Sequence, residues 1–175
     1  MAGMPSAVQL AEGDPALLER VRACRRLLNR RALTGAAASA VPIPGLDWAV
    51  DAALLSRLLP EINAQFGLTP EQLARLPRHQ REQVQKAVSV VGSVVIGKVV
   101  SRDLVIRVAR TVGLRMSGKQ AARFVPLAGQ AVAALMGYAA LRYLGEEHIK
   151  DCVRVVREAR IPLPAPPLSM VERLR

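Results

Sequence analysis

Two stretches of the chain carry the glycine and lysine spacing of a phosphate-binding loop. The first reads GSVVIGKVVS, Gly92 to Ser101, and the second reads GLRMSGKQAA, Gly113 to Ala122. Such a loop needs a Ser or Thr directly after the lysine, because that hydroxyl binds the magnesium ion. Val99 and Gln120 occupy those positions, and the interior of the first stretch is β-branched, which suits a regular element. We therefore expect no nucleotide cofactor.

The other side chains able to do chemistry are few and scattered. The two histidines, His79 and His148, have no partner at metal-ligand spacing, and Cys24 and Cys152 form neither a zinc pattern nor a disulfide framework. The serines lack the G-x-S-x-G turn of a nucleophile. The thiols fit a reduced, cytoplasmic setting.

Two groups of acidic residues come closest to a cation site. Asp47 and Asp51 share a helix face but lack a third ligand, so a helix cap and an arginine partner are the favoured roles. Glu146, Glu147 and His148 are adjacent, and adjacent residues point in different directions on a helix. We expect no metal, no cofactor and no enzymatic activity.

Helical spacing gives the glycines another role. Placed on helices, two apolar segments present small residues every four positions, and residues four apart share one helix face. These small residues are Ser89, Ser93, Gly97 and Ser101 in one segment and Gly129, Ala133 and Gly137 in the other. Small residues let two helix backbones approach closely. The competing interpretation makes the valine-rich run a buried strand.

Helix signals recur along the whole chain and predict an all-α fold. Asp14 and Pro15 start a helix that runs to about residue 40, and a second helix over 46–66 ends at Gly67. Thr69, Pro70 and Gln72 form a capping box for the next helix.

The second half of the chain is less regular. A polar turn, RHQREQVQK, follows Pro77, and Ser101 and Asp103 could cap a helix that ends at Gly113. The apolar run 124–144 continues into an amphipathic helix up to residue 159. We therefore expect a flexible tail over 1–14, a compact helical bundle as a single domain over 15–159, and a Pro-rich, polyproline-like tail over 160–175.

The chain is strongly basic, with a formal net charge of +11, which favours anionic partners. Six arginines gather in the first long helix: Arg20, Arg22, Arg25, Arg26, Arg30 and Arg31. They lie beside apolar sequence and would suit anionic lipid headgroups at the inner face of a membrane. A solvated helix face is the plain alternative. Nucleic acid ranks third, because the aromatic residues lie in apolar segments rather than among the basic ones.

A membrane span is weakly indicated. The run 124–144 is long enough, but Pro126 and Gln130 weaken it, and the run 87–100 is too short. The two segments with small residues at every fourth position could enter a bilayer together as a hairpin. A soluble bundle with an apolar core is slightly favoured by the residues alone.

Two longer stretches resemble a known family domain. AVPIPGLDWAVDAALLSRLLPEINAQFGL and KQAARFVPLAGQAVAALMGYAALRYLGEE are similar to the helical, hydrophobic domain of the YcjF type, over roughly residues 30 to 150. The shared pattern is PIPGLD, an apolar helix ending in FGL, and VPLAG opening a second apolar helix that ends near Gly145. That domain occurs in bacterial membrane-associated proteins and after the GTPase domain of proteins akin to interferon-inducible GTPases. We expect no GTPase domain within these 175 residues.

The resemblance implies membrane association and no catalytic residues. Our expectation is a non-enzymatic helical module at the cytoplasmic face of the inner membrane, alone or beside a separately encoded GTPase or remodelling protein. The alternative is a cytoplasmic helical adaptor that binds a protein partner through the Pro-rich tail and the basic helix. A homo-oligomer is left as an open alternative.

Overall fold

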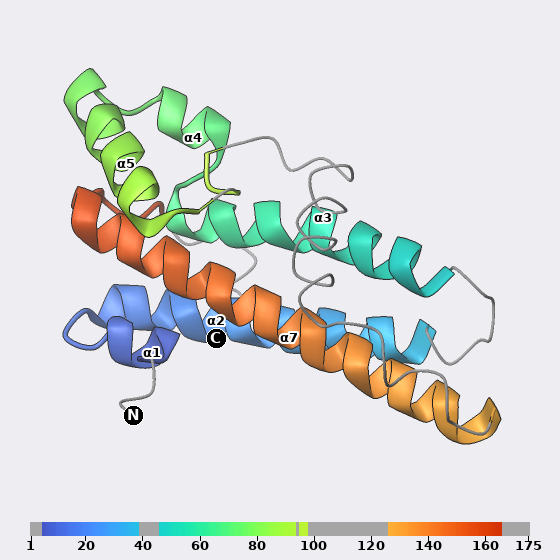
Figure 1. Cartoon of the computed structure of the whole chain (residues 1–175). Coiled ribbons are helices and arrows are strands. Elements are labelled where there is room, and N and C mark those ends of the chain that lie inside the picture. The colour runs from blue at the N-terminus through green and yellow to red at the C-terminus, as the bar shows by residue number, and fades with distance from the viewer. Residues whose placement is uncertain (1–4, 39–45, 94, 98–125, 166–175) are drawn as a thin grey trace. The chain divides into compact units, whose positions relative to one another are not determined.

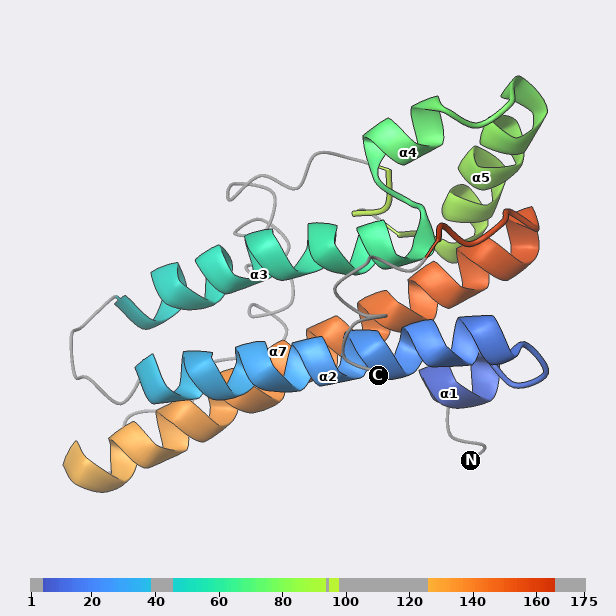
Figure 2. The same ribbon diagram turned by 180° about the vertical axis from the view of Figure 1, so that it is seen from behind.

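The computed structural model describes residues 5–38, 46–93, 95–97 and 126–165. These residues form α1 (Ala7–Leu10), α2 (Pro15–Ala38), α3 (Leu46–Phe66), α4 (Pro70–Ala74), α5 (Arg78–Val91) and α7 (Pro126–Ala159). No strand occurs among them. The all-α prediction is therefore confirmed for the part of the chain that is described (Figures 1 and 2).

The chain divides into two compact units, and the single domain expected over 15–159 stays a prediction. Unit 1 comprises residues 1–24, 60–99 and 147–175, and unit 2 comprises residues 25–59 and 100–146. The boundaries fall inside α2, α3 and α7, so each of these helices contributes residues to both units. Neither unit is therefore a continuous piece of the sequence.

The core of unit 1 comes from three separate stretches of the chain. Its fully buried side chains include Leu17 and Val21 of α2, Ile62 and Phe66 of α3, and Val153 of α7. The positions on α2 follow the predicted spacing of three and four residues. Burial of a large apolar side chain contributes about 1.5–3 kcal/mol, so this core is what holds the three stretches together.

Unit 2 is built around close approaches between helices. A Cβ at Gly35 of α2 would lie 2.7 Å from Leu54 Cδ1 of α3, and one at Gly145 of α7 would clash with the side chain of Leu28 on α2. The family pattern implied that the second apolar helix ends near Gly145. Gly145 instead lies inside α7, which continues to Ala159. It is buried because α2 passes directly over it.

The predicted helix boundaries at three local signals are confirmed. The N–H of Leu17 donates to Asp14 Oδ1 at 3.0 Å, which makes Asp14 the cap of α2. Gly67 ends α3 with a φ of +75°, and the Leu68 N–H donates back to the Asn63 carbonyl at 2.9 Å. Thr69 and Gln72 form the expected capping box at α4.

The N-terminal segment differs from the flexible tail expected over 1–14. Ser6 and Gln9 form a capping box that starts α1, and Ala7 and Ala11 are fully buried. The guanidinium of Arg157 donates to the Leu10 carbonyl. The signal is the same as at Thr69, a hydroxyl residue followed three positions later by Gln, and the small alanines allow close packing.

The polar segment after Pro77 is helical and not a turn. α5 begins at Arg78, and Arg78 Nε donates to Glu82 Oε1 at 3.0 Å, one helical turn later. The segment contains neither Gly nor Pro, and Arg, Gln, Glu and Lys are good helix formers. A mostly polar segment can therefore form a helix here. Val84 and Ala87 are the two buried residues of α5.

The predicted stripe over Ser89–Ser101 is wrong for its described part. α5 ends at Val91, and Gly92 caps it in the left-handed conformation with a φ of +74°. Ser93 and Gly97 therefore lie outside any helix, and Gly97 has a φ of +72°. Its N–H donates to the Leu68 carbonyl at 3.2 Å. The helix predicted from Ser101 and Asp103 to Gly113, like the second glycine–lysine stretch, lies outside the described residues.

The C-terminal tail begins as part of unit 1. Ile161 is buried, and the carbonyl of Pro164 accepts a hydrogen bond from Arg20. A Cβ at Gly67 would lie 3.3 Å from Pro164 Cδ. Residues 161–165 are thus held against the fold, although they are not helical, as the prolines require.

Candidate functional site

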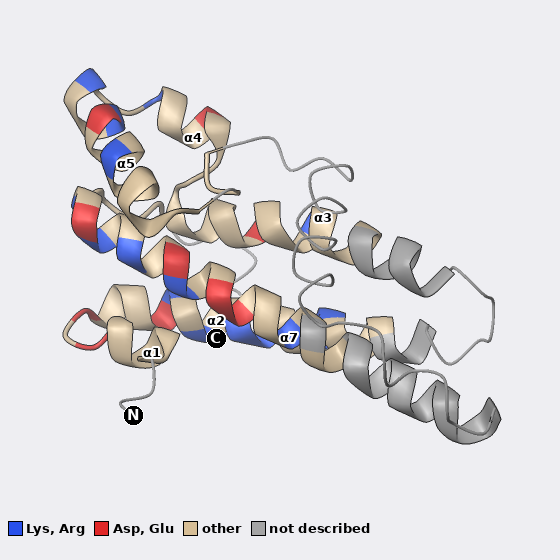
Figure 3. Cartoon of the chain, in the orientation of Figure 1, with Lys and Arg blue, Asp and Glu red and all other residues tan. Residues whose placement is uncertain are grey.

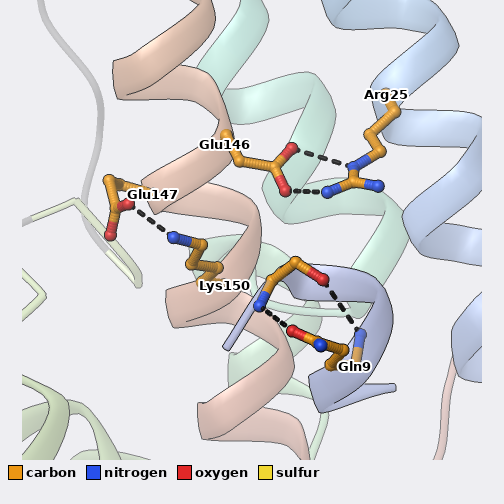
Figure 4. A network of polar contacts seen from close by, with 6 residues as sticks. Gln9, Arg25, Glu146, Glu147 and Lys150 are labelled. Carbon is orange, nitrogen blue, oxygen red and sulfur yellow. Dashed lines mark hydrogen bonds and ion pairs between the residues drawn. The ribbon is translucent and has the colours of Figure 1, made fainter. Parts of the chain in front are cut away.

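The six arginines predicted to bind lipid have different environments. Arg20 is buried and donates to Gln65 Oε1 at 3.1 Å as well as to Pro164. Arg25 forms a two-point ion pair with Glu146, in which Nε lies 2.9 Å from Oε2 (Figure 4). Arg31 is half-buried. Arg20 and Arg25 therefore have structural roles, because their guanidinium groups already have partners within the protein.

The other three arginines are exposed. Arg22, Arg26 and Arg30 follow one another at intervals of four residues along α2, and none has a hydrogen bond or ion pair with another residue in the described part of the chain. Figure 3 shows the basic positions of α2 in blue along that helix. Leu33, seven residues after Arg26, is 61% exposed. Residues three, four and seven apart lie on one face of a helix, so Leu33 shares the face of Arg26 and Arg30.

The small-residue stripe of the late apolar run lies in α7. Gly129, Ala133 and Gly137 belong to this helix, and their side-chain surroundings lie outside the described part. The close helix approaches that the structure does show involve Gly35 and Gly145, which sequence reasoning missed. Each is a single glycine in a helix, and its partner lies far away in the sequence.

The adjacent side chains of Glu146, Glu147 and His148 point in three different directions. Glu146 bonds to Arg25, Glu147 Oε1 accepts from Lys150 Nζ at 2.6 Å, and His148 contacts Asn63 (Figure 4 shows the first two). No group of three His, Cys, Asp or Glu side chains in the searched part of the chain could hold a metal ion. The side chains of Asp47 and Asp51 lie outside that part.

A buried polar cluster joins α3 and α7 within unit 1. Asn63 Oδ1 lies 2.9 Å from His148 Nε2 and 3.6 Å from the Cys152 sulfur. All three side chains are at most 5% exposed. His148 and Cys152 are four residues apart on α7, a spacing visible in the sequence, whereas Asn63 lies 85 positions before His148 and gives no local signal.

Cysteine, histidine and asparagine also occur together in thiol enzymes, where the pKa of the thiol is lowered. Here the environment raises the pKa of the thiol. Burial raises the pKa of the Cys152 thiol well above its usual value, and a neighbouring Cys24 raises it further. Burial likewise raises the pKa of Cys24 to about 12. A nucleophilic cysteine needs a lowered pKa and access to its substrate. The cluster is therefore best described as a satisfied polar contact inside the core.

An open groove lies on unit 1 between the start of α2 and the end of α7. Its volume is about 560 Å³. Its lining residues are Asp14, Ala16, Leu17, Val156, Arg157, Arg160, Ile161, Pro162 and Leu163. Leu17, Val156 and Ile161 are buried, whereas Arg157 and Arg160 are exposed. The groove was not predicted, because it joins two segments separated by almost the whole chain.

No helix in the described part of the chain is long and apolar enough to cross a membrane. Comparison of the chain with models of protein families, with curated proteins and with solved structures finds no match in any of the three. The likeness to the YcjF-type domain therefore remains an expectation that depends on the quoted motifs alone.

Proposed function

We propose that the protein is a non-enzymatic helical module that binds peripherally to the anionic inner face of a bacterial membrane. The observation that carries this proposal is the exposed face of α2. Arg22, Arg26 and Arg30 have no partner among the described residues, and Leu33 follows them, 61% exposed. Of the six arginines expected to contact lipid, these three are exposed, whereas Arg20 and Arg25 have partners within the protein.

Arginine suits lipid phosphates, because its planar guanidinium donates two parallel hydrogen bonds to phosphate oxygens. Each basic residue near an anionic bilayer contributes about 1 kcal/mol. An exposed leucine on the same face adds apolar contact at the boundary between headgroups and acyl chains. Charge and an exposed leucine on one helix face support lipid contact over a merely solvated face.

The decisive experiment measures binding to vesicles of neutral and anionic phospholipid by cosedimentation. Wild-type protein should bind the anionic vesicles and be released by salt. The variant Arg26→Gln/Arg30→Gln should bind about 30-fold more weakly, since two basic contacts contribute ~2 kcal/mol. Leu33→Asn should weaken binding with little change in its salt dependence.

The charge-matched control is Arg75→Gln/Lys86→Gln, which removes two exposed basic groups, one directly after α4 and one in α5. Equal losses in the control and in the α2 variant would show that net charge alone drives binding. Equal binding of the wild type to neutral and anionic vesicles would contradict the proposal. Tighter binding to duplex DNA than to anionic vesicles would favour nucleic acid.

A separately encoded GTPase as partner is supported by the resemblance alone. A GTPase gene beside this one would strengthen that part of the proposal. Co-purification of the two proteins from cells is its direct test, and their consistent separation would remove it while leaving lipid binding in place.

A further inference from the structure

We propose that the groove between the start of α2 and the end of α7 binds an extended peptide segment that alternates acidic and apolar side chains. The groove and the exposed arginines Arg26 and Arg30 of α2 belong to different units, and lipid binding by α2 is not needed for this inference.

The floor and the rim of the groove differ in chemistry. Leu17, Val156 and Ile161 are at most 6% exposed and form its buried base. The apolar surface that a ligand can reach comes from Ala16 and Pro162, which are exposed, and from the half-buried Leu163. Arg157 and Arg160 stand beside them, exposed to solvent. The groove thus offers apolar and charged surface side by side, and its volume of about 560 Å³ falls in the range of binding sites.

The charge of the groove favours an anionic occupant. Asp14 is its only lining carboxylate, and Asp14 Oδ1 already accepts the N–H of Leu17 at the start of α2, where the helix dipole stabilises negative charge. Arg157 uses Nη1 to hold the Leu10 carbonyl. Arg160 has no hydrogen bond or ion pair within the described chain, so its guanidinium is available for a carboxylate.

The shape of the groove favours a peptide over a small molecule. Small ligands are usually enclosed over most of their surface, whereas this groove is partly open to solvent. Successive side chains of an extended peptide point to opposite sides. Alternating leucine and glutamate would therefore place leucines on the floor and carboxylates towards the rim, where the two arginines stand.

Arg160 provides a variant that separates binding from folding. It has a φ of +49° directly after the end of α7, where glycine is the usual residue. Arg160→Gly should therefore raise the melting temperature while removing the guanidinium. Reduced peptide binding by a more stable protein cannot result from misfolding.

The experiment measures fluorescence anisotropy of a labelled peptide of alternating glutamate and leucine, with a lysine–leucine peptide as the charge-reversed control. Wild type should bind only the acidic peptide, and Arg160→Gly and Arg160→Gln should each bind it about tenfold more weakly. Arg75→Gln, an exposed arginine elsewhere in unit 1, should bind like the wild type. Amide chemical shifts should change at Ile161 and Leu163 when the peptide is added.

Three results would overturn the inference. Unchanged affinity in both Arg160 variants would show that the groove does not hold the carboxylates. Equal binding of the lysine peptide would exclude charge recognition. A loss of anionic-vesicle binding in the Arg160 variants, with peptide binding intact, would make lipid the occupant instead.

Discussion

Asn63 occupies a central place among the buried side chains. Its Oδ1 atom faces both His148 Nε2 and the Cys152 sulfur, and its Nδ2 atom lies 3.5 Å from the Val95 carbonyl. A single amide thus links α3, α7 and the segment after α5. No buried side-chain nitrogen or oxygen in the described residues lacks a hydrogen-bond partner. The cluster is stable because it is complete.

Removal of the amide should therefore cost more than removal of the thiol. Asn63→Ala removes the oxygen that both His148 Nε2 and the Cys152 sulfur face, and a lost partner of a buried polar group costs about 1–3 kcal/mol. Cys152→Ala removes only a weak donor, so this variant should lose less free energy of unfolding than Asn63→Ala does. Urea denaturation of both variants measures the difference. A larger loss for Cys152→Ala would mean that packing, and not hydrogen bonding, dominates the cluster.

The two thiols should be unreactive in the folded protein. Burial raises the pKa of Cys24 to about 12 and that of Cys152 well above its usual value, so hardly any thiolate forms at pH 8. Ellman's reagent should therefore react with neither thiol in native protein and with both after denaturation. Rapid reaction of one equivalent in the native state would show that unit 1 opens readily, or that a thiol has a functional role.

At the scale of the helices, Gly145 and Gly35 mark the closest approaches in unit 2. Alanine is normally about 1 kcal/mol better than glycine inside a helix, yet Gly145→Ala should destabilise the protein by about 1–3 kcal/mol. Its new methyl group would meet Cδ1, Cδ2 and Cγ of Leu28, which cannot all move away.

Gly35→Ala should cost less than Gly145→Ala, because only the terminal Cδ1 of Leu54 lies in the way and that end can rotate. Thermal melting of the two single variants gives the order. The double variant Leu28→Ala/Gly145→Ala should show non-additivity, since the first change makes room for the second. Simple additivity would mean that the two helices do not meet at this point.

The helix signals that could be predicted from the sequence are local ones. Asp14, Thr69 with Gln72, and Gly67 act through bonds to residues within a few positions, so the pattern alone identifies them. The stripe predicted over Ser89–Gly97 was wrong because four-residue spacing says nothing about Gly92, whose left-handed conformation ends α5. Gly97, also left-handed, lies beyond that helix.

The long-range features could not be predicted. The ion pair of Arg25 with Glu146 spans 121 positions, and the groove joins the start of α2 to the end of α7. The sequence indicated that six arginines were clustered. It could not indicate that Arg20 is buried and Arg25 paired, because both partners come from distant segments.

For the molecule as a whole, the pH dependence of stability should contain a contribution from Asp151. Partial burial raises its pKa from 3.8 to about 6, although Arg154 lies 3.5 Å away and lowers it. The folded protein thus holds this proton more tightly than the unfolded chain does. The stabilising contribution is fully present below about pH 4 and is lost as the pH rises through about 6.

Asp151→Asn should remove this dependence. The wild type should lose this contribution between pH 4 and pH 7.5, and the variant should not. The difference in the free energy of unfolding, variant minus wild type, should therefore be larger at pH 7.5 than at pH 4, as measured by urea unfolding at both values. Glu158→Gln, exposed on the same helix, is the control and should leave the difference between the two pH values as in the wild type. If Asp151→Asn loses stability at pH 7.5, the ion pair with Arg154 outweighs the burial of the carboxylate.

The long sequence separations within unit 1 have a consequence for synthesis on the ribosome. Leu10 meets Arg157, Arg20 meets Pro164, and Asn63 meets His148, so unit 1 stays incomplete until α7 has been made. Domains usually fold as their residues emerge, and incomplete ones expose apolar surface that aggregates. Until α7 has been made, Leu17, Ile62 and Phe66 of α2 and α3 lack part of the core that buries them, so the incomplete unit exposes apolar surface.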